Sequence, residues 1–598
     1  MSPVRMRDVV AAAQPPSPIC NMESFRDRLR HHGDAAREKI RERLTEPESW
    51  KLPKQASSIA PLHVWTNADQ DPVPVEKQTW TSWVFITYWY SDLVTISTWG
   101  ASSSILTTGL TATDAILICF VAGICNSVPT VLNGAIGADL HIPFPVAVRA
   151  SYGYWLSYFC VVSRGILALF WFGIHSTAGG KCMVQILKAL WPSFAHIPNT
   201  LPAWTGLTTN GMIAYLIYWL IQFPILLIPT HKLQYMFWLK TALVTPMAIA
   251  MVVYVAVKAG GSGDFFYAPA TVSGPTRAWL WLSSLTSVTG AYSTLAVNIP
   301  DFSRFSKSRG AQVWQLPVIP GLKVIIGAFG IIAASAAKKV YGTAYWNPLD
   351  IVNEWQGTPG GRAAAFFCAA LWLLASVSVN VSANAISFAN DITAIAPKYM
   401  NIRRGVVFAA FVGGWALCPW IILASASAFL NFMSAYAIFM APMAGIICCD
   451  YWIVKRRRYD VPALYDPAGI YRYGKWKGCN WRALVSTAVT IVPLLPALAQ
   501  KVAPKNVHID KGLQNLFSFN WLYGFFLAFS LYWALNVVCP HKETLIPRVV
   551  SGYGTSDAVD GVEVDVEGQS LKMDAKDVKD KEAGSGEVAV APIELESR

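Results

Sequence analysis

A polar stripe crosses an otherwise hydrophobic segment at residues 153–177. Arg164, Ala168, Trp171 and His175 follow one another at spacings of four, three and four, and these spacings place side chains on one face of an α-helix. Ionisable side chains are costly inside a membrane-length segment, so this stripe indicates a functional site. Trp171, which lies between Arg164 and His175, offers a flat face for stacking. The alternative is a tryptophan that fills the core and a histidine that is paired with a neighbouring helix.

The composition is that of a polytopic membrane protein. Hydrophobic residues make up 54% of the 598 residues and charged residues 14%, with a mean hydropathy of +0.37, which excludes a soluble domain of ordinary composition. The net charge is +12, but the basic residues lie at the ends of apolar runs, where they set topology. No nucleic acid is therefore expected as a partner. The eleven cysteines form no CxxC pair or Cys/His cluster, so neither a metal site nor a cofactor is indicated.

The apolar runs predict an all-α polytopic membrane protein. Because a span needs about 20 apolar residues, we expect about twelve transmembrane helices. Their centres lie near Leu93, Val121, Leu167, Leu220, Met247, Thr289, Ile325, Val377, Trp415, Ile438, Val492 and Phe526. Residues 80–540 would form this transporter core.

The two ends of the chain are polar. Residues 1–79 are predicted to be a cytoplasmic N-terminal arm with a short surface helix over residues 23–44, and residues 541–598 a disordered cytoplasmic tail. The distribution of Lys and Arg among the loops favours both termini on the cytoplasmic side of a multi-pass protein. We expect a place in the plasma membrane, with the lipid bilayer as a partner. The tails could engage ubiquitin-dependent trafficking machinery.

Two predicted spans carry helix-interrupting residues at membrane depth. Residues 88–104 and 287–304 are both rich in Ser and Thr and contain glycine. A helix that is interrupted inside a membrane exposes backbone polar groups, which is tolerated where they line a cavity. A matched pair, five spans apart, indicates the substrate site of an inverted-repeat transporter. Spans one to five would then repeat as spans six to ten, with two additional helices.

The eighth span carries a second polar stripe. Asn380, Asn384 and Ser387 are spaced four and three apart, which again gives one helix face. A carboxamide offers both donors and an acceptor, the complement of a lactam or ureide edge. Buried asparagines can also simply hold helices together. Under the repeat this stripe corresponds to the one on the third span.

Residues 67–540 resemble the nucleobase cation symporter family one, specifically its fungal Fur-type branch of uracil, allantoin and uridine permeases. The motifs that carry the resemblance are Gln78-Thr-Trp80, Tyr88-Trp89, Ser91-Asp92, Phe144-Pro145 with Arg149, Trp171-Phe-Gly-Ile, Leu239-Lys240 with Thr245-Pro246, and Asn298-Ile-Pro-Asp-Phe-Ser-Arg304. Later motifs are Tyr345-Trp-Asn-Pro-Leu-Asp350, Asn401-Ile-Arg-Arg-Gly405, Cys418-Pro-Trp420, Asp450-Tyr451 and Asn480-Trp-Arg482. The resemblance implies a five plus five inverted repeat with discontinuous helices one and six.

The resemblance also implies a substrate site between spans one, three, six, eight and ten. Trp171 is similar to the family's stacking aromatic residue, and Tyr292 to the opposing one. Asn384 matches the hydrogen-bonding asparagine of the eighth span, with Asn380 one turn before it. His175 stands where several members have Gln, and an imidazole cannot copy a bidentate amide edge.

Two residues of the tenth span are candidates for gating. Phe429 and Met433 are four residues apart and could close over the substrate, as similarly spaced residues do in Fur-type relatives. Ordinary core packing is the alternative reading of both.

The resemblance implies that this chain lacks one oxygen ligand of the cation site that sodium-coupled bacterial relatives have. The matching positions are Ala375 for a carbonyl, Ser378 for one hydroxyl, and Val379 where a second hydroxyl would be. A valine side chain cannot bind sodium, a hard cation that prefers oxygen. The resemblance therefore favours a proton as the coupling ion.

Three ionisable residues at membrane depth could take part in coupling: Asp92, Lys240 and His175. Lys240 could occupy the vacant cation site as a built-in positive charge, or pair with Asp69 or Asp71 of the arm. Extension of its side chain to the membrane interface is a third possibility. Arg164 is expected to brace a helix.

These residues predict proton-coupled import of uracil, allantoin, uric acid or a nucleoside by alternating access. One alternative is a permease of the same family for a vitamin such as thiamine or nicotinamide riboside. Another is a nutrient receptor that does not transport. An enzyme is not expected, because no nucleophile or paired carboxylates stand out at membrane depth.

Overall fold

The computed structural model describes residues 47–551 and two short strands beyond them. Within that range the structure does not describe Ala56, Ser58, residues 229–232, Lys475, Trp476 and Pro504. Two compact units make up the chain, Met1–Pro53 and Lys54–Arg598. The described part of the first unit holds one 3₁₀ helix, Pro47–Trp50. The predicted surface helix over residues 23–44 and most of the predicted tail fall outside the described residues.

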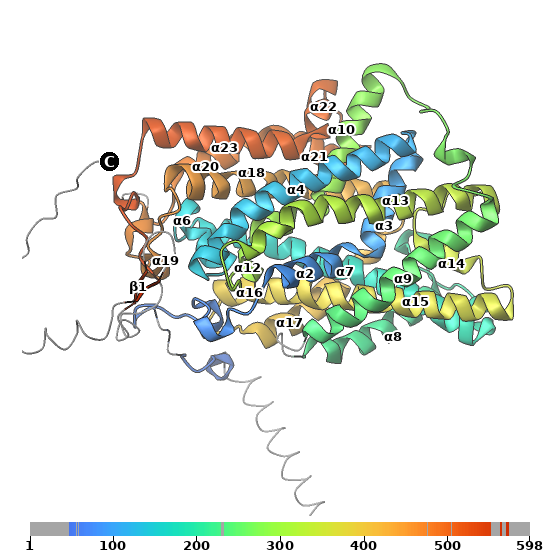
Figure 1. Ribbon diagram of the computed structural model, residues 1–598, viewed down its shortest axis with the longest axis horizontal. Coiled ribbons are helices and arrows are strands. Elements are labelled where there is room, and N and C mark those ends of the chain that lie inside the picture. Colours follow the sequence, from blue (N-terminus) through green and yellow to red (C-terminus); the bar gives the residue numbers. More distant parts are fainter. Residues whose placement is uncertain are drawn as a thin grey trace, which may run out of the picture. The chain divides into compact units, whose positions relative to one another are not determined.

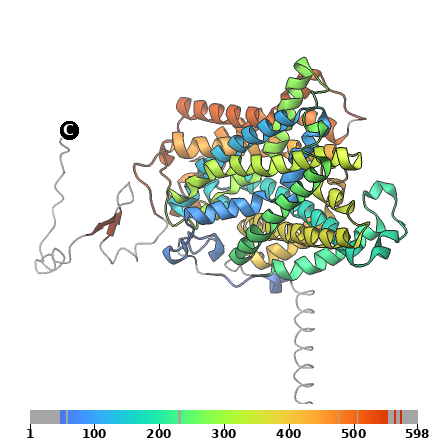
Figure 2. The ribbon, with the colours of Figure 1, turned by 45° about the vertical axis from the view of Figure 1, so that its right-hand side comes forward.

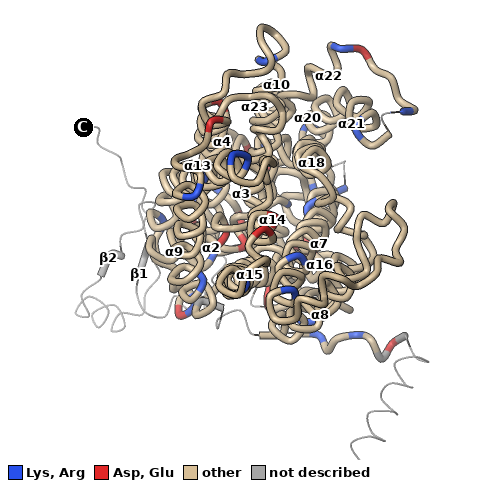
Figure 3. Tube along the Cα trace, turned by 90° about the vertical axis from the view of Figure 1, so that its right-hand side faces the viewer, with Lys and Arg blue, Asp and Glu red and all other residues tan. Residues whose placement is uncertain are grey.

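The second unit is a bundle of long helices that run side by side (Figures 1 and 2). The long helices are α4 (Ala112–Leu140), α7 (Ser157–Leu190), α8 (Thr209–Leu226), α9 (Leu233–Ala259), α13 (Gln315–Tyr341), α15 (Pro359–Val379), α18 (Ala426–Cys449), α20 (Trp481–Ile491) with α21 (Leu495–Val502), and α23 (Asn520–Val538). Within the described residues, nine helical stretches are long and apolar enough to cross a membrane. Charged residues are sparse along the bundle (Figure 3).

The three other predicted spans are interrupted or shorter helices. The first consists of α2 (Ser82–Leu93) and α3 (Ile96–Ser104), and the sixth of α10 (Gly274–Gly290), α11 (Ser293–Asn298) and α12 (Pro300–Ser303). The ninth is α17 (Ile402–Phe411) followed by a π-helical turn, Val412–Ala416. Each of the twelve predicted centres thus lies in a helical segment, and the all-α membrane fold is confirmed.

Both predicted helix breaks are present. Helix α2 ends at Leu93, and Thr95 is extended and caps α3 by accepting a hydrogen bond from the Thr98 amide at 3.1 Å. Helix α10 ends at Gly290, where a Cβ atom would clash with the Met433 carbonyl of α18. The absence of a side chain at Gly290 therefore lets α10 end directly against α18. The inverted repeat that would relate the two breaks stays a prediction.

The eighth span changes from an α-helix to a π-helix at its centre. Helix α15 continues through a π-helical segment, Asn380–Ile386, into α16 (Ser387–Ile395). A π turn closes hydrogen bonds five residues apart instead of four and is frequent at functional sites. This segment carries the asparagine stripe.

Residues 54–79, which we predict as part of the arm, belong to the same compact unit as the helices. Two 3₁₀ turns lie here, η2 (Ala68–Gln70) and η3 (Val75–Lys77). The Asp69 carbonyl accepts a hydrogen bond from Arg304 Nη1 at 2.8 Å. The Gln70 carbonyl accepts one from the Tyr465 hydroxyl at 2.6 Å. These contacts hold the segment against the ends of α12 and α19 (Val461–Tyr465).

The predicted tail contains one element of regular structure that the sequence did not suggest. Strands β1 (Val562–Val564) and β2 (Ser570–Lys572) pair antiparallel, with Glu563 opposite Leu571. The neighbouring residues of the tail lie outside the described part of the chain.

Candidate functional site

A cavity lies between the two helix breaks. It encloses about 420 Å³ of empty space, part of which opens to solvent. Its lining comes from the first, third, sixth and eighth spans: Asp92, Ser97, Thr98, Trp171, His175, Ala291, Tyr292, Thr294, Leu295, Val379, Ala383 and Asn384. Four of the five predicted substrate-binding residues therefore meet at one cavity, together with Asp92.

The cavity has an aromatic, hydrogen-bonding character. Trp171 and His175 come from one face of α7, and their rings lie 5.8 Å apart with 33° between their planes. Tyr292 enters from the break before α11, and Asn384 from the π-helical segment. All four side chains are buried. Flat rings and a carboxamide at one small cavity suit a flat, polar heterocycle.

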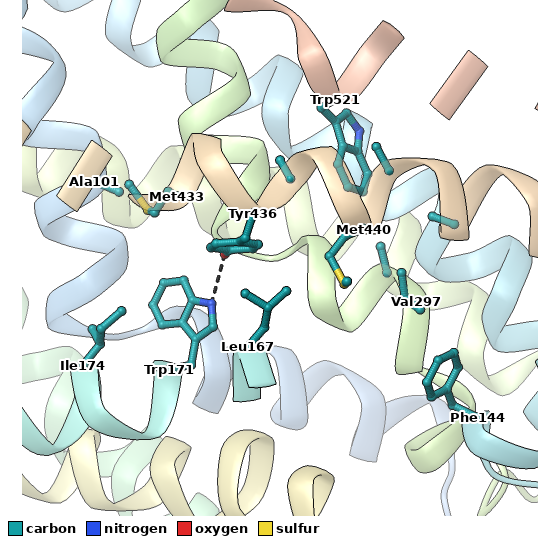
Figure 4. Close-up of a cluster of buried hydrophobic side chains, with 14 of the residues drawn as sticks. Ala101, Phe144, Leu167, Trp171, Ile174, Val297, Met433, Tyr436, Met440 and Trp521 are labelled. Carbon is teal, nitrogen blue, oxygen red and sulfur yellow. Dashed lines mark hydrogen bonds between the residues drawn. The ribbon is translucent and has the colours of Figure 1, made fainter. Parts of the chain in front are cut away.

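Trp171 is held by a hydrogen-bond chain that ends at the break of the sixth span. Its Nε1 donates to the Tyr436 hydroxyl at 2.9 Å (Figure 4), and that hydroxyl donates to the Gly290 carbonyl at 2.6 Å. The indole orientation is therefore linked to the end of α10. Sequence reasoning missed Tyr436, although it lies seven residues after Phe429 and hence on the same face of α18.

Tyr292 connects the two helix breaks. Its hydroxyl lies 2.6 Å from Thr98 Oγ1 and donates to the Asp92 carbonyl at 3.3 Å. Thr98 is in α3 and Asp92 in α2, so one side chain touches both halves of the first span. A change at either break would move this ring at the cavity wall.

The two asparagines of the eighth span have different positions. Asn384 lines the cavity, whereas Asn380 lies behind it. The Asn380 Nδ2 is within hydrogen-bond distance of the Phe172 carbonyl (3.0 Å), Ser176 Oγ (3.0 Å) and Gln222 Oε1 (2.9 Å). Its Oδ1 accepts from Asn384 Nδ2 at 3.1 Å. Asn380 is thus placed to orient Asn384 rather than to meet a ligand in the cavity.

The two predicted gating residues lie behind Trp171, outside the cavity lining. The Phe429 ring meets the Trp171 ring edge-on, with 6.4 Å between centroids, and is stacked on Trp346 at 6.1 Å. Met433 is fully buried in the cluster of hydrophobic side chains that also contains Trp171 and Phe429 (Figure 4). In this conformation both residues pack in the core, and Phe429 contacts the indole.

Lys240 reaches the break of the first span. It is 1% exposed, and its Nζ donates a hydrogen bond to the Ser91 carbonyl near the end of α2. Asp92 lies close enough to Lys240 to interact with it electrostatically. The lysine therefore lies in the protein interior rather than at a membrane interface. The two predicted partners from the arm have other contacts: the Asp69 carbonyl accepts from Arg304, and Asp71 Oδ1 from Ser57 Oγ.

The positions predicted to match a sodium site have the following surroundings. Ser378 Oγ donates to the Leu374 carbonyl of its own helix at 2.7 Å. Ala375 is completely buried in the core, and Val379 presents an apolar side chain to the cavity.

A second buried lysine lies at the break of the sixth span. Lys323 of α13 is 2% exposed, and its Nζ donates to Asn126 Oδ1 at 2.5 Å and to the Val288 carbonyl at 3.1 Å. The same ammonium lies 4.7 Å from the centre of the Tyr292 ring. Sequence reasoning missed this residue. The available signal was a lone lysine within an apolar run, the signal that identified Lys240.

Arg164, the first residue of the stripe, lies away from the cavity lining. It forms a buried ion pair with Asp391 of α16, and its Nη2 donates to the Ser387 carbonyl at 2.5 Å. It therefore braces α7 against α16, as expected.

Broken helices around a buried cavity, without an enzyme-like constellation among the described residues, are typical of a secondary transporter. Residues 72–524 match the family described as permease for cytosine/purines, uracil, thiamine, allantoin. The chain belongs to this family of membrane permeases, which are transporters and not enzymes.

Similar proteins include several fungal permeases. An uncharacterised permease of Schizosaccharomyces pombe is 36% identical over 81% of this chain and 86% of its own length. The allantoin permease of Saccharomyces cerevisiae is 30% identical over 82% of this chain and 78% of its own. The thiamine transporter of the same yeast is 32% identical over 80% of each chain.

Two solved structures of Mhp1, a nucleobase-cation-symport-1 family transporter, share the fold. The inward-facing conformation has a TM-score of 0.62 at 21% identity and covers 81% of this chain and 97% of its own. The closed conformation with bromovinylhydantoin bound has a TM-score of 0.60 at 21% identity, over 79% and 97%. This chain and Mhp1 therefore share an overall fold.

Proposed function

We propose that the protein imports a flat, nucleobase-like compound across the plasma membrane by proton-coupled alternating access. The candidate substrates are uracil, allantoin, uric acid and a nucleoside. The observation that carries the proposal is the cavity between two broken helices, where Trp171, Tyr292, His175 and Asn384 meet. Membership of a family of cytosine/purine, uracil, thiamine and allantoin permeases supports the same class of substrate.

The proposed roles follow from geometry. Trp171 and Tyr292 would hold the ring through their faces, a contact worth about 1 kcal/mol per aromatic pair beyond buried area. Asn384 has an amide oxygen and one N–H left after its bond to Asn380, so it can read a lactam or ureide edge. A buried group of this kind rejects analogues that leave it unpaired. His175, one turn after Trp171 on α7, would then distinguish among rings from another wall of the cavity.

A proton is the proposed coupling ion. The Lys240 ammonium is bonded to the Ser91 carbonyl, a backbone oxygen at the helix-one break where a bound cation would otherwise be expected. Asp92, beside it, faces the cavity and can take up and release a proton. Both termini would be cytoplasmic, and the Lys-containing tail could accept ubiquitin during trafficking.

A vitamin substrate is the second candidate, because thiamine and nicotinamide riboside transporters of Saccharomyces cerevisiae are 32% and 30% identical to this chain. The carboxylate of Asp92 at the cavity would suit their positively charged rings. Against this, Lys240 places a positive charge beside that carboxylate.

Uptake in cells that lack their own permeases tests the proposal. Labelled uracil, allantoin, uric acid, uridine, thiamine and nicotinamide riboside are supplied at several concentrations. We expect saturable uptake of one of the first four, abolished when the pH gradient is collapsed and unaffected when sodium is replaced. Saturable uptake of a vitamin alone would establish the second candidate. If the protein reaches the cell surface but takes up none of these compounds, the proposal of transport fails and the non-transporting receptor is the alternative that remains.

A further inference from the structure

A second pocket lies at the end of the bundle where residues 64–70 pack. It comprises about 370 Å³ of empty space, part of which opens to solvent, and we call it the arm pocket. Its lining is Val64, Trp65, Thr66, Gln70, Val146, Arg149, Tyr154, Tyr158, Thr393, Ala394, Pro397 and Tyr465. Val64, Trp65, Tyr158 and Pro397 are partly exposed, so the arm pocket reaches the surface of the protein.

Two buried polar atoms at the arm pocket have no hydrogen-bond partner among the described residues. They are Oε1 of Gln70 and Oγ1 of Thr393, whose residues are 3% and 0% exposed. A helical threonine commonly bonds the carbonyl of the preceding turn, and Thr393 does not. An unpaired buried polar atom costs about 1–3 kcal/mol. Two of them at one cavity indicate a ligand that supplies the missing bonds.

The remaining wall determines the chemistry of that ligand. Trp65, Tyr154 and Tyr158 contribute aromatic rings. The Arg149 guanidinium lies 4.5 Å from the centre of the Tyr154 ring, and Lys398 lies 5.8 Å from that of Trp65. Two nearby cations disfavour a positively charged ring and favour carbonyl oxygens. Gln70 Oε1 needs an N–H or O–H donor.

The arm pocket and the central cavity share one helix. Asn384 lines the cavity, and Thr393 lies nine residues later on the same span. At about 1.5 Å per residue this separates the two sites by about 14 Å. The Gln70 Nε2 donates to the Asn390 carbonyl at 3.1 Å, which ties the wall of the arm pocket to the end of that helix.

We propose that the arm pocket is a second binding site for a neutral or anionic flat ring that bears carbonyl and N–H groups. This inference rests on the proposed function. In the orientation given there, the arm pocket lies on the cytoplasmic side, and the transported ring occupies it on the way from the central cavity into the cell. There the Thr393 hydroxyl donates or accepts a hydrogen bond, Gln70 Oε1 accepts one, and the aromatic wall covers the ring.

The test measures the two sides of the membrane separately. Right-side-out sealed plasma-membrane vesicles that contain the full-length protein are preloaded with unlabelled uracil, allantoin, uric acid or uridine, whichever is taken up. Entry of the labelled compound is then followed as internal concentration is varied. Thr393→Val removes the hydroxyl at nearly constant volume, and Ala394→Phe fills the arm pocket. Thr490→Val is the matched control, because Thr490 is buried and bonds its own helix in α20.

We expect the internal half-saturating concentration to rise about fivefold in Thr393→Val, the effect of one lost hydrogen bond. A larger rise is expected in Ala394→Phe. The external half-saturating concentration should stay within twofold of wild type in both variants, and Thr490→Val should change neither value. Internal values within twofold of wild type in both pocket variants would overturn the inference, as would equal shifts on both sides. Absence of uptake by the wild type would instead refute the proposed function and this inference with it.

Discussion

The breaks of the first and sixth spans are alike in one respect and differ in another. In each, a buried lysine from a different helix donates to a carbonyl near the end of the first half-helix: Lys240 to Ser91, and Lys323 to Val288. The carbonyl end of a helix carries a partial negative charge, so each ammonium stabilises the end of a half-helix. The neighbours differ. Lys240 interacts with the Asp92 carboxylate, whereas Lys323 contacts the Asn126 amide and the Tyr292 ring.

We infer different tasks for the two breaks from this difference. At the first break a carboxylate faces both the cavity and a lysine, so one proton changes the charge of the pair. At the sixth break the described partners of Lys323 in hydrogen bonds and ring contacts are neutral, so its charge is expected to hold geometry. We therefore place coupling at the first break and ring positioning at the sixth.

Loss of Lys240 should have the largest effect. Lys240→Met removes the cation that acts on the buried Asp92 carboxylate and leaves the Ser91 carbonyl without its donor. We expect accumulation against a gradient to disappear, measured as the ratio of internal to external labelled substrate at equal surface expression. Lys258→Met is the matched control, since Lys258 lies near the end of the same helix. Asp92→Asn combined with Lys240→Met should reach the surface and likewise show no accumulation.

Lys323→Met sharpens the contrast between the breaks. Because Lys323 supports Tyr292, we expect the half-saturating substrate concentration to rise about fivefold, in line with about 1 kcal/mol for a lost cation–π contact and hydrogen bond. Uptake should remain dependent on the pH gradient. Lys323→Arg should retain most of the affinity, and Lys339→Met, on the same helix, should match wild type. If Lys323→Met lost pH coupling as completely as Lys240→Met, the distinction between the two breaks would fail.

The asparagine pair allows a similar comparison within the eighth span. Asn384→Ala removes the group at the cavity, and we expect about a tenfold loss of affinity for the transported ring, near the upper range of one buried hydrogen bond. Asn380→Ala should cost less affinity, because it acts through Asn384, but more thermal stability, because it leaves Gln222 and Ser176 with fewer partners. Competition binding and thermal unfolding of the purified protein measure the two effects. Equal affinity losses would place Asn380 at the ligand.

Ser378→Ala should have the smallest effect. The hydroxyl is bonded to its own helix at 2.7 Å, and the adjacent Val379 offers no oxygen ligand. Uptake rates should therefore be unchanged in Ser378→Ala and insensitive to replacement of sodium by choline. A sodium-dependent rate that Ser378→Ala abolishes would contradict the assignment of a proton.

Much of this arrangement follows from local sequence. Hydroxyl-rich, glycine-containing segments at membrane depth predicted both breaks, and helical spacing predicted that Trp171 and His175 share a face. The same spacing could not tell which asparagine faces the cavity, because the π-helical segment changes the angle between successive residues. Lys323 and Tyr436 were missed because their importance depends on which helices pack together. The arm pocket likewise combines residues from four segments that lie far apart in the sequence.

Equilibrium binding of the transported compound to purified wild-type protein and to Trp171→Ala tests the central claim most directly. Loss of the stacking face should weaken binding by about 1.5–3 kcal/mol, roughly ten- to a hundredfold. Trp171→Phe, which keeps a ring but loses the bond to Tyr436, should lose less. Thermal unfolding of each variant verifies that the fold is intact. We predict this graded loss with a native fold, and unchanged affinity in Trp171→Ala would contradict a site between the two broken helices.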